Sequence, residues 1–152
     1  MSLTAEEKTA VQDTWGVVAK DLKGNSIKVF LHFFTMFPEY QKLFRGFADT
    51  PMDQLPENRR FKAHAFTVVS AINGLIDNLD DPEMLCELLV KTGQNHAKRS
   101  IKIGDFKNLN DCLMDLFSKI FGEAWTPVAK SGWSKVFSVV LEKVAEGLKL
   151  NE

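Results

Sequence analysis

Two of the chain's three histidines stand where apolar side chains are expected. His64 lies on the apolar stripe of a long helical segment, and His96 lies at the end of the stripe of a shorter one. Because a buried imidazole needs partners for its polar nitrogens, each of these two is either a satisfied core residue or a ligand. His32 lies off the main stripe of its segment, and we expect it at the surface.

Metal binding by His64 and His96 needs ligands from outside the protein. No Cys, Asp or Glu shares their faces, so the pair does not complete a zinc site. Cys86 and Cys112 belong to no metal-binding spacing, and we expect both as reduced thiols of an intracellular protein. Two histidines do suit haem, because the porphyrin supplies four nitrogens and the protein supplies one or two axial ligands.

Other chemistry finds little support in the sequence. There is no GxSxG motif, no glycine-rich phosphate loop, and no histidine close in sequence to either cysteine, so we expect no enzyme. With 19 basic and 20 acidic side chains, and a net charge of −1, we expect neither nucleic acid nor a membrane as a partner. The chain shows no long apolar run and no secretory signal, which predicts a cytoplasmic location.

The apolar residues recur with the period of a helix almost throughout, and no segment alternates as a strand does. We predict one all-α domain over residues 1–152, with seven or eight helices and no sheet. The helix limits are predicted from capping residues, prolines and glycines. The first helix is expected to start at the capping box Thr4–Glu7 and to end at Gly24, and the second to run from about Ser26 to Phe37. Further helices are expected to start at Pro56, at Asp81-Pro82, near Asp105 and at Pro127.

Aromatic side chains are unusually frequent, with twelve Phe and three Trp. Such a content suits the lining of a wide apolar pocket, and it equally suits a well-filled helical core. Several apolar residues near the two histidines are expected to point inward. They are Phe44, Phe47, Met52, Leu55, Val68, Leu85, Leu88 and Leu89.

Taken together, these residues resemble the globin family from Trp15 to Leu148, and molluscan intracellular globins in particular. Trp15 is similar to the tryptophan of the first globin helix, and Trp125 and Trp133 resemble those of invertebrate globins. Pro38 followed by Phe44 and Phe47 resembles the corner that packs against the haem. The segment Phe61–Val68 resembles the distal segment, with His64 as distal histidine. The segment Gln94–Arg99 resembles the proximal segment, with His96 as the axial ligand.

The resemblance implies a fold of helices around a haem pocket, and reversible binding of oxygen and other diatomic ligands to haem b, iron protoporphyrin IX. His96 would bind the iron through one ring nitrogen, while its other N–H donates to a carbonyl at the end of its own helix. His64 would donate a hydrogen bond to oxygen, which is worth ~1.5–3 kcal/mol, or roughly ten- to hundredfold in affinity. The residues implied around haem and ligand are Phe30, Phe44, Phe47, His64, Val68, Leu89, Asn95, His96 and Arg99.

Three positions depart from the commoner globin pattern. Phe30 stands where many globins carry leucine, and it is expected to narrow the distal pocket. Thr92, one turn before His96, replaces a larger apolar residue. Gly46 stands where some globins place a basic residue near a haem propionate. Of the arginines, Arg99 and Arg45 are best placed to meet the propionates and Arg60 less so, and an unpaired surface role suits each equally well.

Two further functions and the assembly remain open. One is a sensor or redox globin in which His64 itself binds the iron, and the other is a haem enzyme such as a nitric oxide dioxygenase or a nitrite reductase. The chain is expected as a monomer or a homodimer. Phe66 is turned away from the main stripe of its helix, so it marks either a contact between copies or a singly exposed residue.

Overall fold

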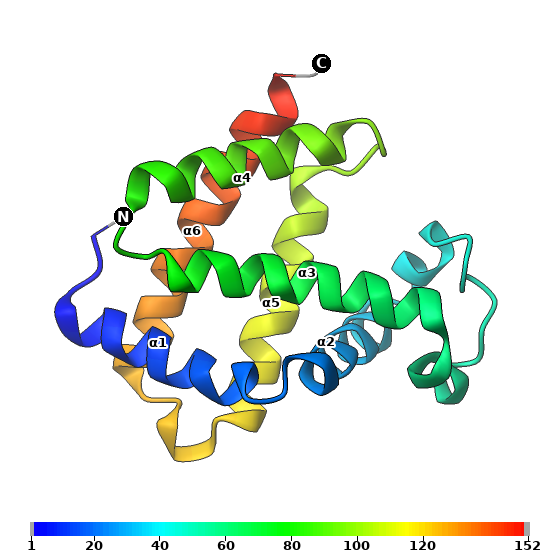
Figure 1. Ribbon diagram of the computed structural model, residues 1–152, viewed down its shortest axis with the longest axis horizontal. Helices are drawn as coiled ribbons and strands as arrows, with labels where there is room; N and C mark the ends of the chain where they lie inside the picture. The colour runs from blue at the N-terminus through cyan, green and yellow to red at the C-terminus, as the bar shows by residue number, and fades with distance from the viewer. Residues whose placement is uncertain (1, 151–152) are drawn as a thin grey trace. The chain divides into compact units, whose positions relative to one another are not determined.

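The computed structural model describes residues 2–150, and the regular structure in that range is entirely helical. This confirms the predicted all-α class. The α-helices are α1 (Ala5–Ala19), α2 (Leu22–Met36), α3 (Arg59–Asp77), α4 (Pro82–Ala97), α5 (Ile103–Ile120) and α6 (Pro127–Lys149) (Figure 1). Three short 3-10 helices join them, η1 (Pro38–Leu43), η2 (Met52–Glu57) and η3 (Gly122–Ala124).

The chain divides into two compact units, which separate the two histidines of interest. Residues 15–74 form one, which we call the central unit and which contains His64. The described residues before and after it, 2–14 and 75–150, form the other, which we call the terminal unit and which contains His96. The single domain over residues 1–152 stays a prediction.

Several helix starts lie where the capping residues predict them. At Thr4–Glu7 each side chain accepts a hydrogen bond from the backbone N–H of the other residue, at 2.9 and 3.0 Å, so the predicted capping box is present. Asp81 caps α4 and Thr126 caps α6 through their side chains, and in both helices a proline follows in the first turn.

The prediction that Gly24 ends the first helix is wrong. Helix α1 ends at Ala19, and α2 begins at Leu22 with the Asp21 carboxylate accepting a hydrogen bond from the Gly24 N–H at 3.1 Å. Gly24 therefore lies in the first turn of α2. An aspartate three residues before a glycine caps a helix start, and this signal outweighs the tendency of glycine to end one.

The prediction that Pro56 opens the long helix is also wrong. Pro56 lies inside η2, and α3 begins at Arg59. The cap is Asn58, whose side-chain oxygen accepts a hydrogen bond from the Phe61 N–H at 3.0 Å. Proline suits a 3-10 turn as well as the start of an α-helix, because both need its fixed φ.

The core of the terminal unit is built on Trp133, which is 0 % exposed, and on its neighbour Phe117, whose ring centroid lies 4.7 Å away. The buried indole N–H of Trp133 donates to Thr14 Oγ1 at 2.9 Å. The Thr14 hydroxyl in turn donates to the Ala10 carbonyl at 2.7 Å. This chain of hydrogen bonds satisfies an otherwise costly buried donor.

Cys112 of α5 is also buried in the terminal unit. Its burial raises the pKa of its thiol to about 12.

In the central unit, α3 buries Phe61, Ala65 and Val69, which lie four residues apart along one face. His64 and Val68 lie beside this face and are half-buried. Phe61 and Ala65 of the expected stripe are therefore buried, whereas its members His64 and Val68 are only half-buried. These two residues, which carry the predicted function, lie on the flank of the buried face.

Two of the apolar residues expected to point inward are exposed instead. Leu88 is 41 % exposed, because α4 buries Leu85, Leu89 and Gly93, which form a stripe at four-residue spacing that leaves Leu88 to one side. Met52 is 40 % exposed at the first position of η2, where the chain has only begun to turn.

Candidate functional site

His96 lies in the last turn of α4 and is half-buried. Its Nδ1 lies 2.7 Å from the carbonyl oxygen of Thr92, one turn earlier. A carbonyl oxygen only accepts, so Nδ1 carries a proton, and in the neutral imidazole Nε2 then has the lone pair. The hydrogen bond expected between His96 and a carbonyl at the end of its own helix is therefore present. Phe106 also contacts the imidazole in a T-shaped arrangement, with ring centroids 5.1 Å apart.

This tautomer prepares Nε2 of His96 to bind a metal. Ligating histidines almost always donate their second N–H to a carboxylate, a carbonyl or water, which fixes the orientation of the ring and raises its basicity. Among residues 2–150 no group of three His, Cys, Asp and Glu side chains could hold a metal ion. One imidazole in this state fits a metal that brings its other ligands with it, as haem iron does.

His64 lies in an aromatic box made by two helices and a loop of the central unit. The edge of Phe30 from α2 approaches the imidazole, with centroids 5.0 Å apart and planes at 75°. Phe44, directly after η1, lies closer, with a centroid distance of 4.4 Å. The register predicted for the second helix is therefore right, because it places Phe30 against His64.

Phe47 packs on the rings that surround His64, chiefly on Phe44. Its ring stacks on Phe44 with centroids 5.0 Å apart and planes at 12°, and its edge packs on Phe61 at 5.5 Å. Phe47 is buried and lies farther from His64, at 6.3 Å. The structure thus brings together Phe30, Phe44, Phe47 and His64, as expected. Phe47 contacts His64 least and stabilises the position of Phe44 by stacking on it.

The remaining predicted site residues differ in exposure. Val68 is half-buried one turn after His64 on the same helix. Leu89 is buried in α4, whereas Asn95 and Arg99 are exposed around the end of that helix. Contact of these four residues with a cofactor stays a prediction.

The side chain of Arg60 lies against Gly46, and which of the arginines meets a propionate stays a prediction. A Cβ atom at Gly46 would lie 2.5 Å from Cδ of Arg60, so the arginine side chain crosses the space that Gly46 leaves open. A cationic side chain from α3 thus lies over the position where some globins place a basic residue, two residues after Phe44. Arg45 is exposed. No local sequence signal reports this approach, because Gly46 and Arg60 meet only through the fold.

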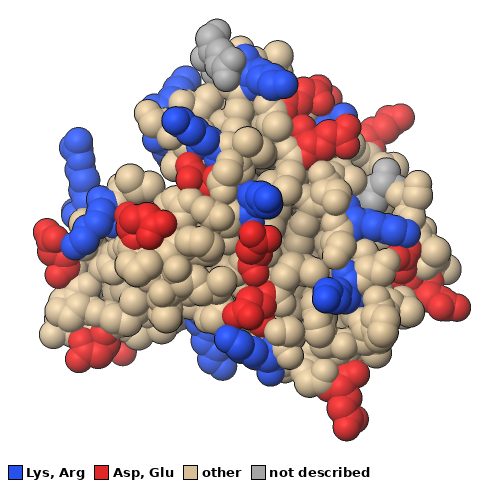
Figure 2. Space-filling view, turned by 180° about the vertical axis from the view of Figure 1, so that it is seen from behind, with Lys and Arg blue, Asp and Glu red and all other residues tan. Residues whose placement is uncertain are grey.

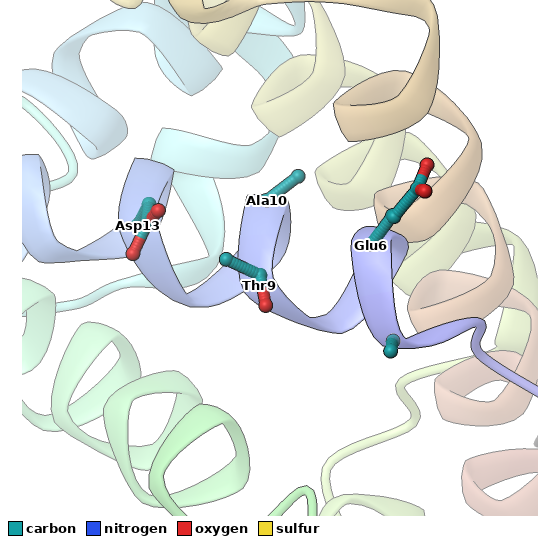
Figure 3. Close-up of a pocket in the computed structure, with 5 residues that line it drawn as sticks. Glu6, Thr9, Ala10 and Asp13 are labelled. Atoms are coloured by element: carbon teal, nitrogen blue, oxygen red, sulfur yellow. The ribbon is translucent and has the colours of Figure 1, made fainter.

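Two hollows lie away from the residues described so far. One, of about 420 Å³, runs along α1, and its labelled side chains come from successive turns of that helix (Figure 3). The other, of about 370 Å³, lies between α2 and α3 and is lined in part by Phe66, which is 38 % exposed. Neither hollow includes His64 or His96. Whether Phe66 marks a contact between copies of the chain or is a singly exposed apolar residue stays a prediction.

Charged side chains are mixed on the face shown in Figure 2, where blue and red alternate without forming a large patch of one sign. This matches a chain with almost equal numbers of acidic and basic residues. Within the described residues, none of the helices combines the length and the apolar character that crossing a bilayer requires.

Comparison with known proteins gives consistent matches over most of the chain. The family model described as Globin matches residues 27–144. A globin of the mollusc Nerita albicilla is 30% identical over 139 residues, which are 91% of this chain and 88% of that protein. Cytoglobin-2 of Danio rerio is 30% identical over 140 residues, 91% of this chain and 78% of that protein. Among solved structures, a hexacoordinated heme protein from an anhydrobiotic tardigrade has a TM-score of 0.87 at 22% identity, covering 97% of this chain and 96% of that one.

Proposed function

We propose, for a chain that belongs to the globin family, that it holds haem b and binds oxygen reversibly for transport or storage. The observation that carries this proposal is the state of His96. Its Nδ1 donates to the Thr92 carbonyl at 2.7 Å, which leaves Nε2 of the neutral imidazole available to a metal.

The residues present fit the group. His96 Nε2 would bind the iron, and the half-buried ring of Phe44 would pack on the porphyrin. Arg60 and Arg99 are the cations proposed for the propionates, since guanidinium groups pair well with carboxylates. When bound, the haem iron supplies the reversible binding of a diatomic ligand.

His64 would contribute an imidazole N–H that donates a hydrogen bond to the bound ligand, and aromatic rings surround this imidazole. Phe30 and Phe44 both contact the imidazole of His64, and each contact favours the orientation that the ring has here. Each such aromatic contact is worth ~0.5–1.5 kcal/mol. A donor held in this way loses little entropy when it bonds to a ligand, and the surrounding rings exclude water that would compete for it.

A second candidate is a sensor or redox globin in which His64 binds the iron when no external ligand is present. It is favoured by the similarity to a cytoglobin and to a protein described as hexacoordinated. The same imidazole serves both functions, so the residues alone do not separate them. The half-buried position of His64 allows either one.

The visible spectrum of the deoxygenated ferrous protein separates the two candidates. We expect one broad band, which indicates five-coordinate iron. Two sharp bands that become one broad band in His64→Leu would instead establish the bis-histidyl form. This measurement needs only purified protein, haem and a reductant.

The role of His96 is tested by its removal. His96→Ala should retain haem poorly, because no other imidazole on α4 replaces the lost ligand. The matched control is His32→Ala, which removes a half-buried histidine of α2 and should leave the haem content unchanged. Full haem content and an unaltered ferrous spectrum in His96→Ala would overturn the assignment.

A further inference from the structure

Helices α4 and α6 touch through their backbones, and two glycines make this contact possible. Helix α4 crosses the C-terminal part of α6 (Figure 1). A Cβ atom on Gly93 of α4 would lie 2.2 Å from the Val144 carbonyl oxygen and 2.9 Å from the Leu148 nitrogen. A Cβ atom on Gly147 of α6 would lie 2.0 Å from the Val90 carbonyl oxygen. The two glycines therefore face each other across the closest point of the crossing.

The atoms in these contacts belong to helical backbones, which have no rotamer to change. Ordinary van der Waals contact of a Cβ begins at 3.4 Å, so a methyl group at Gly93 is short by about 1.2 Å and one at Gly147 by about 1.4 Å. A side chain at either position therefore requires the helices to separate. Close-packed interiors transmit such a displacement to the residues attached to them.

The turn of α4 that contacts α6 is also the turn that positions the imidazole of His96. Thr92, which accepts the hydrogen bond of His96, directly precedes Gly93. His96 follows Gly93 by three residues, the spacing of neighbours on a helix surface. Gln94, which directly follows Gly93, contacts α6 as well, because its backbone nitrogen lies 3.0 Å from the position of a Cβ on Gly147. The contact with α6 therefore fixes the segment from Val90 to Gln94, and this segment fixes the imidazole.

We propose that the Gly93–Gly147 contact is a positioning device for His96. By holding α4 close to α6, it sets the position and the tilt of the imidazole, and hence the strength of the bond that His96 would make to haem iron and the ligand affinity that the haem would have. Gly93 and Gly147 are positioning residues, because they act through His96. The inference rests on the proposed binding of haem by this histidine.

The test is Gly147→Ala in the haem-loaded, deoxygenated ferrous protein, with the iron–histidine stretching band read by resonance Raman spectroscopy. We expect the band to shift, since the imidazole moves with α4. A misplacement on the order of 1 Å at a reacting group can cost up to roughly a hundredfold in rate, and we expect the oxygen dissociation rate to change by about tenfold. Gly93→Ala should shift the band in the same direction, because it separates the same two helices.

The matched control is Gly132→Ala in the same helix. A Cβ at Gly132 would lie 2.8 Å from Cγ2 of Val11 and 3.0 Å from the Glu7 carbonyl oxygen. It strains the contact of α6 with α1 and not with α4. Gly132→Ala should lower the thermal midpoint while leaving the band in place. An equal band shift in Gly132→Ala, or an unmoved band in folded Gly147→Ala, would overturn the proposal.

A second pair of variants covers the case in which Gly147→Ala does not fold. Leu148→Ala opens space beside the same contact without adding a clash, and Val11→Ala does so at the Gly132 contact. The band should move in Leu148→Ala and stay in Val11→Ala, and the reverse result contradicts the proposal. If the wild type shows no iron–histidine band, the proposed function fails. If the wild type shows the band and none of these variants moves it, only the positioning role fails.

Discussion

Replacing Phe30 by leucine tests how the aromatic box protects the ligand site. The ring of Phe30 is 3 % exposed and makes edge contacts with Phe33 and Phe34 at 5.9 Å and with His64 at 5.0 Å. Leucine loses all three ring contacts, and a core truncation of this kind costs about 1–3 kcal/mol of unfolding free energy. The contact with His64 is only one part of this cost.

The functional effect comes from the imidazole. Loss of one aromatic contact worth ~0.5–1.5 kcal/mol lowers the preference of His64 for its native orientation by roughly two- to tenfold. Space for water and for a second ligand also opens where the ring of Phe30 lay. We therefore expect autoxidation of the oxygenated protein, and its reaction with nitric oxide, each to rise by roughly two- to tenfold. That result would make Phe30 a feature of an oxygen store and not of a nitric oxide scavenger.

Visible absorbance follows autoxidation, and stopped-flow mixing follows the reaction with nitric oxide. The control is Phe33→Leu, which removes another buried ring of α2, one that stacks on Tyr40 with centroids 4.8 Å apart. This variant should lose comparable stability without raising either rate. Rates that stay level or fall in Phe30→Leu, or that rise equally in Phe33→Leu, would refute the reasoning.

Three further changes have defined outcomes. His64→Leu should raise the oxygen dissociation rate by roughly ten- to hundredfold and speed oxidation, while carbon monoxide binding weakens less or tightens; an unaltered oxygen dissociation rate contradicts the role of His64. A lysine hydrogen bond lowers the pKa of Glu7 from 4.5 to about 2, so its stabilisation is present above pH 4.5 and lost as pH falls to about 2. The thermal midpoint of Glu7→Gln should therefore fall less steeply over this window than that of the wild type or of Glu6→Gln. Arg60→Gln should transfer haem to an excess of acceptor protein faster than Arg45→Gln does, and equal rates would show that Arg60 does not hold a propionate.

Several features that the sequence predicted depend on short stretches of chain. The hydrogen bond of His96 joins residues four apart in one helix. The capping box at Thr4–Glu7 is likewise local. Helical periodicity and capping chemistry suffice for the helices and the capping box. The contact of Phe30 with His64 joins two helices, and it was expected from the resemblance to globins and not from a local pattern. The hydrogen-bond partner of His96 was expected from the same resemblance.

The features that the sequence did not predict depend on which segments meet in the folded chain. Arg60 lies over Gly46 because α3 passes beside the loop that follows η1. Thr14 accepts the indole N–H of Trp133 from 119 residues away. In both cases the residue types alone suit many partners. The errors at helix limits have another cause, since an aspartate before Gly24 reverses the usual meaning of glycine.

The burial of Cys112 makes the chain selective in its thiol chemistry. With a pKa of about 12, this thiol stays protonated at neutral pH, and it is also closed to solvent. Cys86, the other cysteine, is half-buried on α4 and forms no disulfide. A thiol-reactive dye will therefore attach to α4 alone, ten residues before His96, and will give a fluorescent or paramagnetic reporter on the helix that carries the imidazole without any substitution in the chain.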